Sequence, residues 1–317
     1  MDRDSGTVLS IIIPTFNRSE ILGKCLRALS RQSVPAGLFE VIISDDGSTD
    51  GTREVARDIG EKALPNLRYL WQPNSGASAA RNKAIMAAGG RILLIINDDT
   101  IATRTMLEKH LRAHELFPAE HYAVLGRVTI ADDVPYSPFA RMHLDASFNA
   151  IEGRDDLDWR AFFTCNLSVK RSFLVKYGLF EEKFKVLHED LELGHRLSRH
   201  GLKVLYRPDA LGYHHHFIDE DAYFKSALQD GRSLAIWYKK APHLGVELAS
   251  LGFYRTAPFP GKLRYAAADL LINRFSIPFL QSAARVLSGK NEAFALKLYS
   301  KIYQSMKRKA IRDELCD

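Results

Sequence analysis

One stretch of the chain reads Arg91-Ile92-Leu93-Leu94-Ile95-Ile96-Asn97-Asp98-Asp99-Thr100, in which five large aliphatic residues run directly into two carboxylates. An apolar run of this length is typical of a strand buried on both faces. Packing cannot explain Asp98 and Asp99, because an ionised carboxylate loses several kcal/mol on entering a dry interior. Ligands of open α/β sheets collect outside the carboxyl ends of the strands. We therefore expect both acids to line a crevice and to face a positive group, such as a divalent metal that holds a diphosphate.

The residues before this stretch repeat a strand, a polar loop and a helix three times. Asn17, with Glu20 three residues later, is predicted to cap the first helix as a capping box. Pro14 is predicted to end the first strand, because proline cannot donate to a central ladder. The alternation predicts an α/β fold with a mostly parallel central sheet and helices on both faces. The strands are expected over 7–14, 39–44 and 67–71, and the helices from about residues 17, 52 and 78.

The chain after residue 100 continues the pattern less regularly. We expect a helix over 103–116, a strand over 122–130 and a strand in 161–170, where apolar and polar residues alternate. The irregular residues 131–160 between them are long enough to form a binding loop or lid. With 317 residues, 46% of them hydrophobic, the sequence favours one large domain over 1–240 with a helical extension over 241–317.

Acidic residues also follow the second predicted strand. Asp45 lies nearest the strand end, where an acid can accept a hydrogen bond from the imide N–H of a uracil or thymine ring. For Asp46, Ser48 and Asp50, an Asx-turn or a helix cap explains the residue as well as a ligand contact does. Arg81, near the start of the third helix, is either an exposed helix cation or a partner for the acids and the diphosphate.

Four motifs occur in the order and spacing typical of family 2 glycosyltransferases that use nucleotide sugars. The resemblance covers about residues 8–240 and implies the Rossmann-like GT-A fold, with a nucleotide-binding half over about 7–100 and an acceptor-side half over about 101–240. It also implies an inverting transfer from a nucleoside diphosphate sugar, with UDP, dTDP or GDP as the nucleotide. The motifs are Pro14-Thr15-Phe16-Asn17-Arg18, Asp45-Asp46-Gly47-Ser48-Thr49-Asp50-Gly51-Thr52, Asn74-Ser75-Gly76 with Ala80-Arg81-Asn82, and Asn97-Asp98-Asp99.

The resemblance implies roles for individual residues. Thr15 and Asp45 would contact the base, Arg81 the base or the diphosphate, Asp98 the ribose or the sugar, and Asp99 the metal. The acceptor would be a hydroxyl of a glycan or of a lipid-linked glycan, and residues 131–160 would border its site. Further donor contacts within the same motifs are Pro14, Asn17, Arg18, Gly76 and Asn97.

Asn97 is a departure from the family pattern, which usually has an aspartate at this position of the short acidic motif. An asparagine can hydrogen-bond a ribose or coordinate weakly through its amide oxygen, but it brings no charge. Asp99 retains the last carboxylate of the motif, so we expect metal binding to survive. The departure bears on metal affinity and on how strictly activity depends on the metal.

Glu189 and Asp190 fall in the first turn of a predicted helix that ends before Gly201. Acids there stabilise the helix macrodipole, and a carboxylate can alternatively take a proton from an attacking hydroxyl. The resemblance implies that Asp190 is the catalytic base and that Glu189 is a supporting contact. Asn166 resembles a residue of the family's acceptor-side strand that approaches the donor sugar, or else it is a polar residue inside a strand.

Three consecutive histidines follow Asp190 after 24 residues, in Tyr213-His214-His215-His216. In an extended segment His214 and His216 share one face and His215 points to the other. They form either a solvated rim or, as the resemblance implies, a ligand that completes the metal site with Asp99. His214 is the better placed and His216 is the reserve. Oxygen ligands with one imidazole suit Mn²⁺, with Mg²⁺ as the second candidate.

Basic residues concentrate in the tail. From Ile236 onward there are 14 basic and 6 acidic residues, a net charge of +8, which leaves −2 for the rest of a chain whose total is +6. Residues 261–311 alternate basic and apolar side chains. They form helices packed on the catalytic domain or on a second subunit of a homodimer, or they contact the inner face of a membrane, at roughly 1 kcal/mol per surface cation. We expect no nucleic-acid partner.

The amino terminus has no signal-peptide pattern, and no stretch reaches the length of a membrane span. Cys25, Cys165 and Cys316 are odd in number and lack the spacing of metal ligands. We therefore expect a cytoplasmic protein with reduced, structural cysteines.

Two other classes of protein remain as alternatives. A nucleotidyltransferase on a related sheet would release pyrophosphate, but it normally carries a glycine-rich phosphate loop near its first strand, and residues 14–18 contain no glycine. An inactive nucleotide-sugar binder is compatible with Asn97. Retention of Asp99, Asp190 and His214 argues against it.

Overall fold

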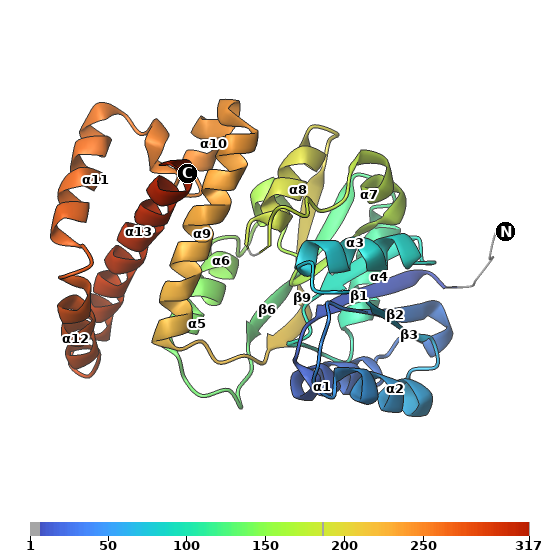
Figure 1. The fold of residues 1–317 in the computed structure, drawn as a ribbon. Helices are drawn as coiled ribbons and strands as arrows, with labels where there is room; N and C mark the ends of the chain where they lie inside the picture. Colours follow the sequence, from blue (N-terminus) through green and yellow to red (C-terminus); the bar gives the residue numbers. More distant parts are fainter. Residues whose placement is uncertain (1–6, 186, 317) are drawn as a thin grey trace. The chain divides into compact units, whose positions relative to one another are not determined.

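The computed structural model describes residues 7–185 and 187–316, except for the side chain of residue 143. The described chain divides into two compact units. The first comprises residues 1–136, 143–185 and 189–217, and the second comprises 137–142, 186–188 and 218–317. The fold is mixed α/β, with a curled, mostly parallel sheet in the first unit and helices in the second (Figure 1).

The first half of the sheet is parallel, with strands in the order β3-β2-β1-β4. Each of its strands leads into a helix or a polar turn at the carboxyl end, as the sequence predicts. Thr15 pairs with Asp45 in register, so the loops after β1 and β2 start side by side. The elements are β1 (Leu9–Thr15), α1 (Ser19–Leu29), β2 (Phe39–Asp45), α2 (Thr52–Ala63), β3 (Leu67–Trp71), α3 (Ala77–Ala87) and β4 (Ile92–Ile96).

The second half of the sheet continues from β4 in the order β8-β6-β9-β5, with β7 paired to β9. Here β6 and β9 are parallel, whereas the pairs of β8 with β4 and β6, and of β9 with β5 and β7, are antiparallel. The elements are β5 (Thr100–Ala102), α4 (Met106–Leu116), β6 (Tyr122–Ile130), α6 (Ala146–Asn149), β7 (Asp156–Leu157), β8 (Asn166–Lys170), α7 (Arg171–Tyr177), α8 (Glu189–Ser198) and β9 (Lys203–His214).

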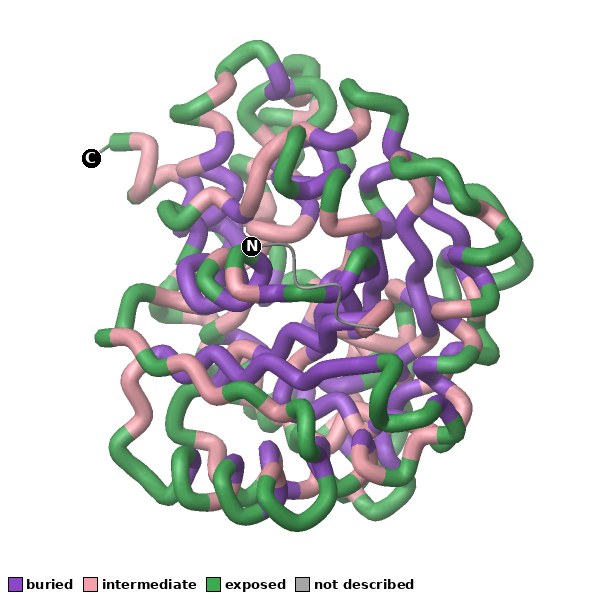
Figure 2. The backbone as a smooth tube through the Cα atoms, turned by 90° about the vertical axis from the view of Figure 1, so that its right-hand side faces the viewer, coloured by how far each residue is buried: buried purple, intermediate pink, exposed green. Residues whose placement is uncertain are grey.

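The core of the first unit is formed by the central strands and the inward faces of α1 and α2. All five residues of β4 are buried, as its apolar run predicts, and so are all seven of β2. Figure 2 shows these strands as continuous buried runs inside exposed loops. Each large aliphatic side chain buried in this way contributes about 1.5–3 kcal/mol of transfer free energy, so the strands hold the loop residues at their ends rigidly.

The predicted capping box at Asn17 is wrong. Helix α1 begins at Ser19 with Arg18 as its N-cap, and no side chain of that residue caps the helix. Asn17 has a φ of 52°, and its Oδ1 accepts a hydrogen bond from Thr49 N at 2.7 Å instead. The amino end of α1 is satisfied by a distant residue, since Asp50 accepts from Ser19 N at 3.0 Å and also from Thr52 N at 3.1 Å in the first turn of α2.

Two predicted boundaries also differ from the structure. The helix expected from residue 103 begins at Met106, because residues 100–102 form the short strand β5 and Thr103 Oγ1 donates to Leu211 O on β9 at 2.7 Å. The strand expected in 161–170 is limited to β8, and a 3-10 turn at Trp159–Ala161 precedes it. A third difference is at Pro14, which does not end β1: the strand continues to Thr15, and Pro14 lies just beyond the residues that pair with β4, where its missing N–H costs no ladder bond to that strand.

The second unit is a helical bundle built mainly on α9 and α13. Aromatic residues form its core, among them Tyr223 and Phe224 of α9 and Tyr299 and Tyr303 of α13. Its C-terminal segment begins at Ile218, because α9 packs with α13, whereas the boundary expected from the sequence is at 240. Its helices are α5 (Pro138–Ala140), α9 (Glu220–Lys240), α10 (Gly245–Ala249), α11 (Phe259–Leu271), α12 (Ile277–Ser288) and α13 (Glu292–Cys316).

A buried ion pair crosses this bundle. Asp230 on α9 lies 2.8 Å from Lys307 Nζ on α13 and 2.7 Å from His188 Nε2, and Tyr303 Oη donates to it at 3.1 Å. Burial raises the pKa of Asp230, but the hydrogen bond from His188 and the charge of Lys307 outweigh it and lower the pKa to about 2. Asp230 is therefore a fully neutralised structural acid.

Among residues 7–185 and 187–316, no helix combines the length and the apolar character that a membrane crossing requires.

Candidate active site

Asp98 and Asp99 lie directly after β4, each with 4% of its surface exposed. Thr15 Oγ1, at the end of β1, donates to Asp98 Oδ2 at 2.8 Å. The guanidinium of Arg18 lies 3.1 Å from Asp98 Oδ1 and 2.9 Å from Asp99 Oδ2. Two adjacent buried carboxylates therefore share one arginine.

The electrostatic balance of this pair leaves excess negative charge. Burial raises the pKa of Asp98; Arg18 lowers it, and the neighbouring Asp99 raises it again, with a net result of about 6. One guanidinium does not compensate two buried carboxylates. The site therefore has the charge that attracts a further cation.

The histidine segment meets Asp99 through the β5–β9 ladder, in which Thr100 pairs with His214. His214 Nε2 lies 3.6 Å from Asp99 Oδ2, and the His216 ring lies 5.8 Å from the His214 ring. His215 points the other way and contacts Asp133 at 2.9 Å. The predicted alternation of the three imidazoles is thus confirmed, and the structure places His214 next to Asp99.

Arg81 is buried, which rules out the exposed helix cation considered from the sequence. Its Nη1 donates to Glu189 Oε1 at 2.8 Å and its Nη2 to Asn97 Oδ1 at 3.4 Å. The guanidinium also lies 5.4 Å from the centroid of the Phe180 ring. Arg81 therefore links the first turn of α8 to the acidic motif after β4.

Asp190 follows Glu189 in that first turn of α8. Its Oδ1 accepts from Leu191 N at 2.7 Å and its Oδ2 from Thr164 N at 3.4 Å. The next residue, Cys165, accepts from Thr100 Oγ1 at 3.1 Å through its carbonyl oxygen. The segment 164–165 thus joins Asp190 to the strand that follows Asp99.

The pKa of the Cys165 thiol also reflects the two acids, Asp190 and Asp99. Burial first and the charge of Asp190 next raise its pKa, and Asp99 adds to the rise, while a backbone hydrogen bond and Arg81 lower it, with a net result of about 12. Cys165 is therefore close to both carboxylates. The three segments that carry Asp99, Asp190 and His214 therefore meet in one region of the first unit.

Buried polar atoms without a hydrogen-bond partner among the described residues gather here. They include Asp99 Oδ1, Glu189 Oε2 and Arg81 Nε. Buried polar groups are normally hydrogen-bonded, so unpaired ones at a charged site are candidates for contacts with a ligand. In the described part of the chain, no three His, Cys, Asp or Glu side chains form a ready metal site. The pair Asp99 and His214 still fits an ion that completes its coordination with phosphate oxygens and water, because two donor atoms 3.6 Å apart can both lie about 2.1 Å from one metal.

The loop after β2 is held by its own hydrogen bonds. Asp45 is fully buried, and its carboxylate accepts from Ser48 N at 2.7 Å and from the hydroxyl of Tyr69. Asp46 accepts from Ser75 N and Gly76 N, both at 2.8 Å. These bonds tie Asp46 to the loop before α3, so they are neither the Asx-turn nor the helix cap considered for Asp46 from the sequence. A base contact by Asp45 stays a prediction.

Asn166 lies beside the acidic motif, because it pairs with Ile96 in the β4–β8 ladder, but its side chain makes other contacts. It is fully buried in β8; its Oδ1 lies 2.9 Å from His110 Nε2, and its Nδ2 donates to Ala210 O at 2.8 Å and to Arg127 O at 3.2 Å. These contacts occupy the amide, which corresponds to the alternative of a polar residue inside a strand. We therefore leave Asn166 out of the proposed donor site.

The remaining predicted donor contacts border the acids through the backbone. Pro14 precedes Thr15 in β1, and Asn17 N donates to Ser48 Oγ at 2.8 Å. Gly76 is the N-cap of α3 with a φ of 97°, a conformation that favours glycine, and a Cβ there would meet Lys185 Cδ at 3.0 Å. These residues shape the loops that surround the site.

Sequence reasoning missed several supporting residues. Tyr69, which was read only as part of a strand, binds Asp45, and Thr164 holds Asp190 through its backbone N–H. The alternation in β3 gave a signal for Tyr69, since it lies two residues before Trp71, which pairs with Asp45. The contact of Thr164 depends on a backbone group and has no sequence signal.

A sheet of this topology, with acids at the carboxyl ends of its parallel strands and a histidine beside them, is the architecture of GT-A glycosyltransferases. The model of the family described as glycosyl transferase family 2 matches residues 10–178, more than half of the chain. The chain belongs to this family.

Known proteins similar to the chain agree with this assignment. It is 30% identical over 233 residues to validoxylamine A glucosyltransferase of Streptomyces hygroscopicus subsp. jinggangensis (strain 5008), a match that covers 65% of this chain and 54% of the relative. The chain thus spans about half the length of this curated relative.

Two solved structures share the fold. The mannosyltransferase PcManGT of Pyrobaculum calidifontis, in complex with GDP-Man and Mn²⁺, aligns with a TM-score of 0.65 at 18% identity over 97% of this chain and 86% of that one. TarS 1-349 of S. aureus in complex with UDP aligns with a TM-score of 0.55 at 16% identity over 97% and 92%.

Proposed function

We propose that the protein is an inverting glycosyltransferase that moves a sugar from a nucleoside diphosphate sugar to an acceptor hydroxyl. One observation carries the proposal: the unpaired buried atoms of Asp99, Arg81 and Glu189 lie in one network with a carboxylate pair that a single arginine fails to neutralise. Such a site suits a ligand that brings a cation with it. A sugar diphosphate with a bound divalent metal is such a ligand.

Asp99 and His214 would hold Mn²⁺ or Mg²⁺. A metal bound there would stabilise the negative charge that develops on the departing nucleoside diphosphate. Asp98, which is held by Thr15, is the acceptor for a ribose or sugar hydroxyl. The amide oxygen of Asn97 accepts a hydrogen bond from Arg81. Because Asn97 carries no charge, it lowers metal affinity, but Asp99 and His214 remain as the two proposed metal ligands.

Arg18 has a second use in this proposal. In the structure its half-buried guanidinium bridges the two acids, with 33% of the side chain exposed. A metal at Asp99 would compete for the same oxygen. The guanidinium would then be available for the diphosphate, for which its planar donors are well suited.

Asp190 is the proposed catalytic base. Its two backbone hydrogen bonds fix the carboxylate in the first turn of α8, and Glu189 is fixed separately by Arg81. A fixed carboxylate can take the proton of the acceptor hydroxyl as that oxygen attacks the anomeric carbon and the bond to the diphosphate breaks. The attack from the opposite side inverts the anomeric centre, and no covalent intermediate forms.

Two measurements test which nucleotide the protein binds and whether it is a transferase, a nucleotidyltransferase or an inactive binder. Thermal shift against UDP, dTDP and GDP, with and without Mn²⁺, should show a metal-dependent rise in melting temperature for one of them. Incubation with the matching nucleotide sugars and an acceptor should release nucleoside diphosphate. Pyrophosphate would indicate a nucleotidyltransferase, and binding without any product would indicate an inactive binder.

The second unit favours a peripheral membrane contact, which would suit a lipid-linked glycan as acceptor. None of the described residues of α11 is buried, and large apolar side chains stand exposed along α11, α12 and the turn between them. Arg274 stacks over Phe275 in that turn, with its guanidinium carbon 4.5 Å from the ring centroid. Exposed apolar rings among cations are typical of helices that lie in a membrane interface. The exposed residues are Phe259, Leu263, Leu270, Leu271, Phe275 and Phe279.

Liposome sedimentation tests this surface. Vesicles with anionic lipid should bind the protein, and Phe275→Ser with Phe279→Ser should weaken binding by about tenfold or more, because two large side chains lose their burial. The matched control is Met86→Ser with Leu116→Ser, which removes two exposed apolar side chains from the first unit. Absence of binding, together with a dimer in solution that the same Phe variants dissociate, would assign the surface to a second subunit.

A further inference from the structure

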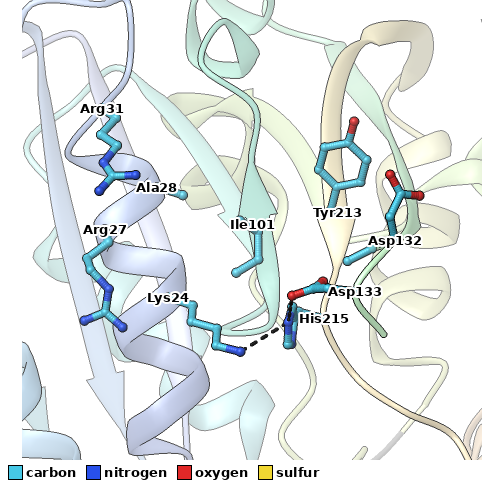
Figure 3. Close-up of a pocket in the computed structure, with 10 residues that line it drawn as sticks. Lys24, Arg27, Ala28, Arg31, Ile101, Asp132, Asp133, Tyr213 and His215 are labelled. Carbon is cyan, nitrogen blue, oxygen red and sulfur yellow. Dashed lines mark hydrogen bonds and ion pairs between the residues drawn. The ribbon is translucent and has the colours of Figure 1, made fainter. Parts of the chain in front are cut away.

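A groove lies on the opposite face of the β5–β9 pair from Asp99 and His214. Its volume is about 560 Å³, which is within the usual range of small-ligand sites. Figure 3 shows helix α1 along one side, Ile101 of β5 at the centre, and Tyr213 with Asp132 on the far side. All of its lining residues belong to the first unit.

The separation from the donor site follows from strand alternation. Tyr213 and His215 line the groove, whereas His214 between them reaches Asp99 on the other face. His215 is fixed between two partners, with its Nε2 2.9 Å from Asp133 Oδ2 and 3.2 Å from Lys24 Nζ. The groove therefore has a rigid wall that the proposed chemistry does not use.

The wall formed by α1 is basic. Lys24, Arg27 and Arg31 follow one another at spacings of three and four residues, so they project from the same face of the helix. Arg27 and Arg31 are exposed, and neither makes an ion pair with any residue in the part of the chain that the structure describes. Like charges at this spacing destabilise a helix slightly. Glu20 lies 3.9 Å from Lys24 Nζ, but Arg27 and Arg31 have no acid within ion-pair distance among the described residues. An anion bound in the groove would supply the missing negative charge.

The other walls limit what that anion can be. Asp132 and Asp133 line the side of the groove away from the basic helix, and their charge would repel a continuous polyanion such as a nucleic acid. The same carboxylates can accept hydrogen bonds from sugar hydroxyls. Ile101, Ala28 and the ring of Tyr213 supply an apolar surface against which the C–H face of a sugar ring can pack.

We infer that this groove binds a saccharide through one of its anionic groups, a carboxylate or a phosphate ester. Arg27 and Arg31 hold the anion, Asp132 accepts from hydroxyls, and Tyr213 packs on the ring. Use of the groove to anchor the acceptor chain rests on the proposed function, whereas binding itself does not.

Calorimetry on the full chain at low salt, without donor or metal, tests the inference. The probes are a tetrasaccharide of alternating glucuronate and N-acetylglucosamine, N-acetylglucosamine 6-phosphate, and neutral chitotetraose. At least one charged probe should bind, and the neutral probe should bind about tenfold more weakly or not at all, because it lacks the charge-assisted hydrogen bonds. The charged probe that binds identifies the source of the anion.

Arg27→Gln with Arg31→Gln should weaken binding of the charged probe by roughly tenfold or more, because hydrogen bonds between charged groups are lost. The matched control is Arg57→Gln with Arg112→Gln, which removes two exposed helix cations elsewhere in the first unit and should leave binding unchanged. Equal weakening by both pairs, equal binding of chitotetraose, or no binding of either charged probe would overturn the inference. The Asp99→Asn variant should still bind the probe, which separates failure of the groove from failure of the proposed transferase chemistry.

Discussion

Asp98 in the first unit and Asp230 in the second are both buried aspartates with basic partners, yet their pKa values move in opposite directions. For Asp98, burial and the neighbouring Asp99 outweigh the shared Arg18, and the pKa rises to about 6. For Asp230, burial is outweighed by His188 and Lys307, and the pKa falls to about 2. The difference is the ratio of positive to negative partners within hydrogen-bond distance.

This ratio separates an acid that stabilises the fold from an acid that is available for chemistry. Asp230 has three cationic or hydrogen-bonding partners of its own, Lys307, His188 and Tyr303, and connects α9 to α13. The pair Asp98 and Asp99 divides one guanidinium and retains an unpaired oxygen. Carboxylates that the fold leaves under-compensated are candidates for binding a cation with its substrate.

The largest expected effect concerns Asp190, the acid of the first unit assigned to proton transfer. Asp190→Asn should lower kcat by about 10²–10⁴-fold, because the amide cannot accept the proton of the acceptor hydroxyl. Donor affinity should stay unchanged. Release of nucleoside diphosphate measures the first quantity and nucleotide titration the second. Asp209→Asn, at an exposed acid of the same unit, is the control; activity retained by Asp190→Asn would remove the assignment.

The next effect tests the structural role of Asp230. Asp230→Asn leaves Lys307, which is only 5% exposed, without its counter-charge. A broken buried ion pair costs about 3–5 kcal/mol, so the free energy of unfolding in urea should fall by that amount. Asp221→Asn, at an exposed position on the same helix, should change it by less than about 0.5 kcal/mol. Similar losses in both variants would contradict the comparison.

The pH dependence of Asp230 should be smaller. Its folded pKa of about 2 lies below the unfolded value of 3.8, so its contribution to stability is present above about pH 4 and is lost as the pH falls toward 2. A shift of this size corresponds to roughly 2 kcal/mol. The difference in unfolding free energy between the native chain and Asp230→Asn should therefore shrink between pH 5 and pH 2. A constant difference would show that the aspartate is not ionised in the fold.

The smallest effect is expected at Asp98 and has the opposite sign. Its folded pKa of about 6 lies above 3.8, so the ionised side chain destabilises the fold, fully so above about pH 6. Asp98→Asn should leave stability at pH 7.5 unchanged or raise it by about 1 kcal/mol, since Arg18 still has Asp99. Nucleotide binding should weaken in the same variant. A large loss of stability would place Asp98 among the structural acids.

Much of the fold could be predicted because it depends on local patterns. The apolar run 92–96 became β4, and the strands and helices of residues 9–87 lie where their spacing predicts them. The errors occur where distant groups decide. Asn17 failed as a cap because Asp50, which is far along the chain, satisfies α1, and β5 was missed because three residues form a strand only when β9 pairs with them.

For the site, the sequence determined which residues are chemically out of place, because paired carboxylates after a buried strand and consecutive histidines have no packing explanation. Tertiary structure alone decided their partners. Arg18 contacts both Asp98 and Asp99, and Arg81 is buried against Glu189. The amide of Asn166 is occupied by hydrogen bonds inside the fold. The physical reason is that composition fixes a side chain's capacity for charge and hydrogen bonding, whereas its pKa and its role depend on which groups the folded chain holds within about 3 Å of it.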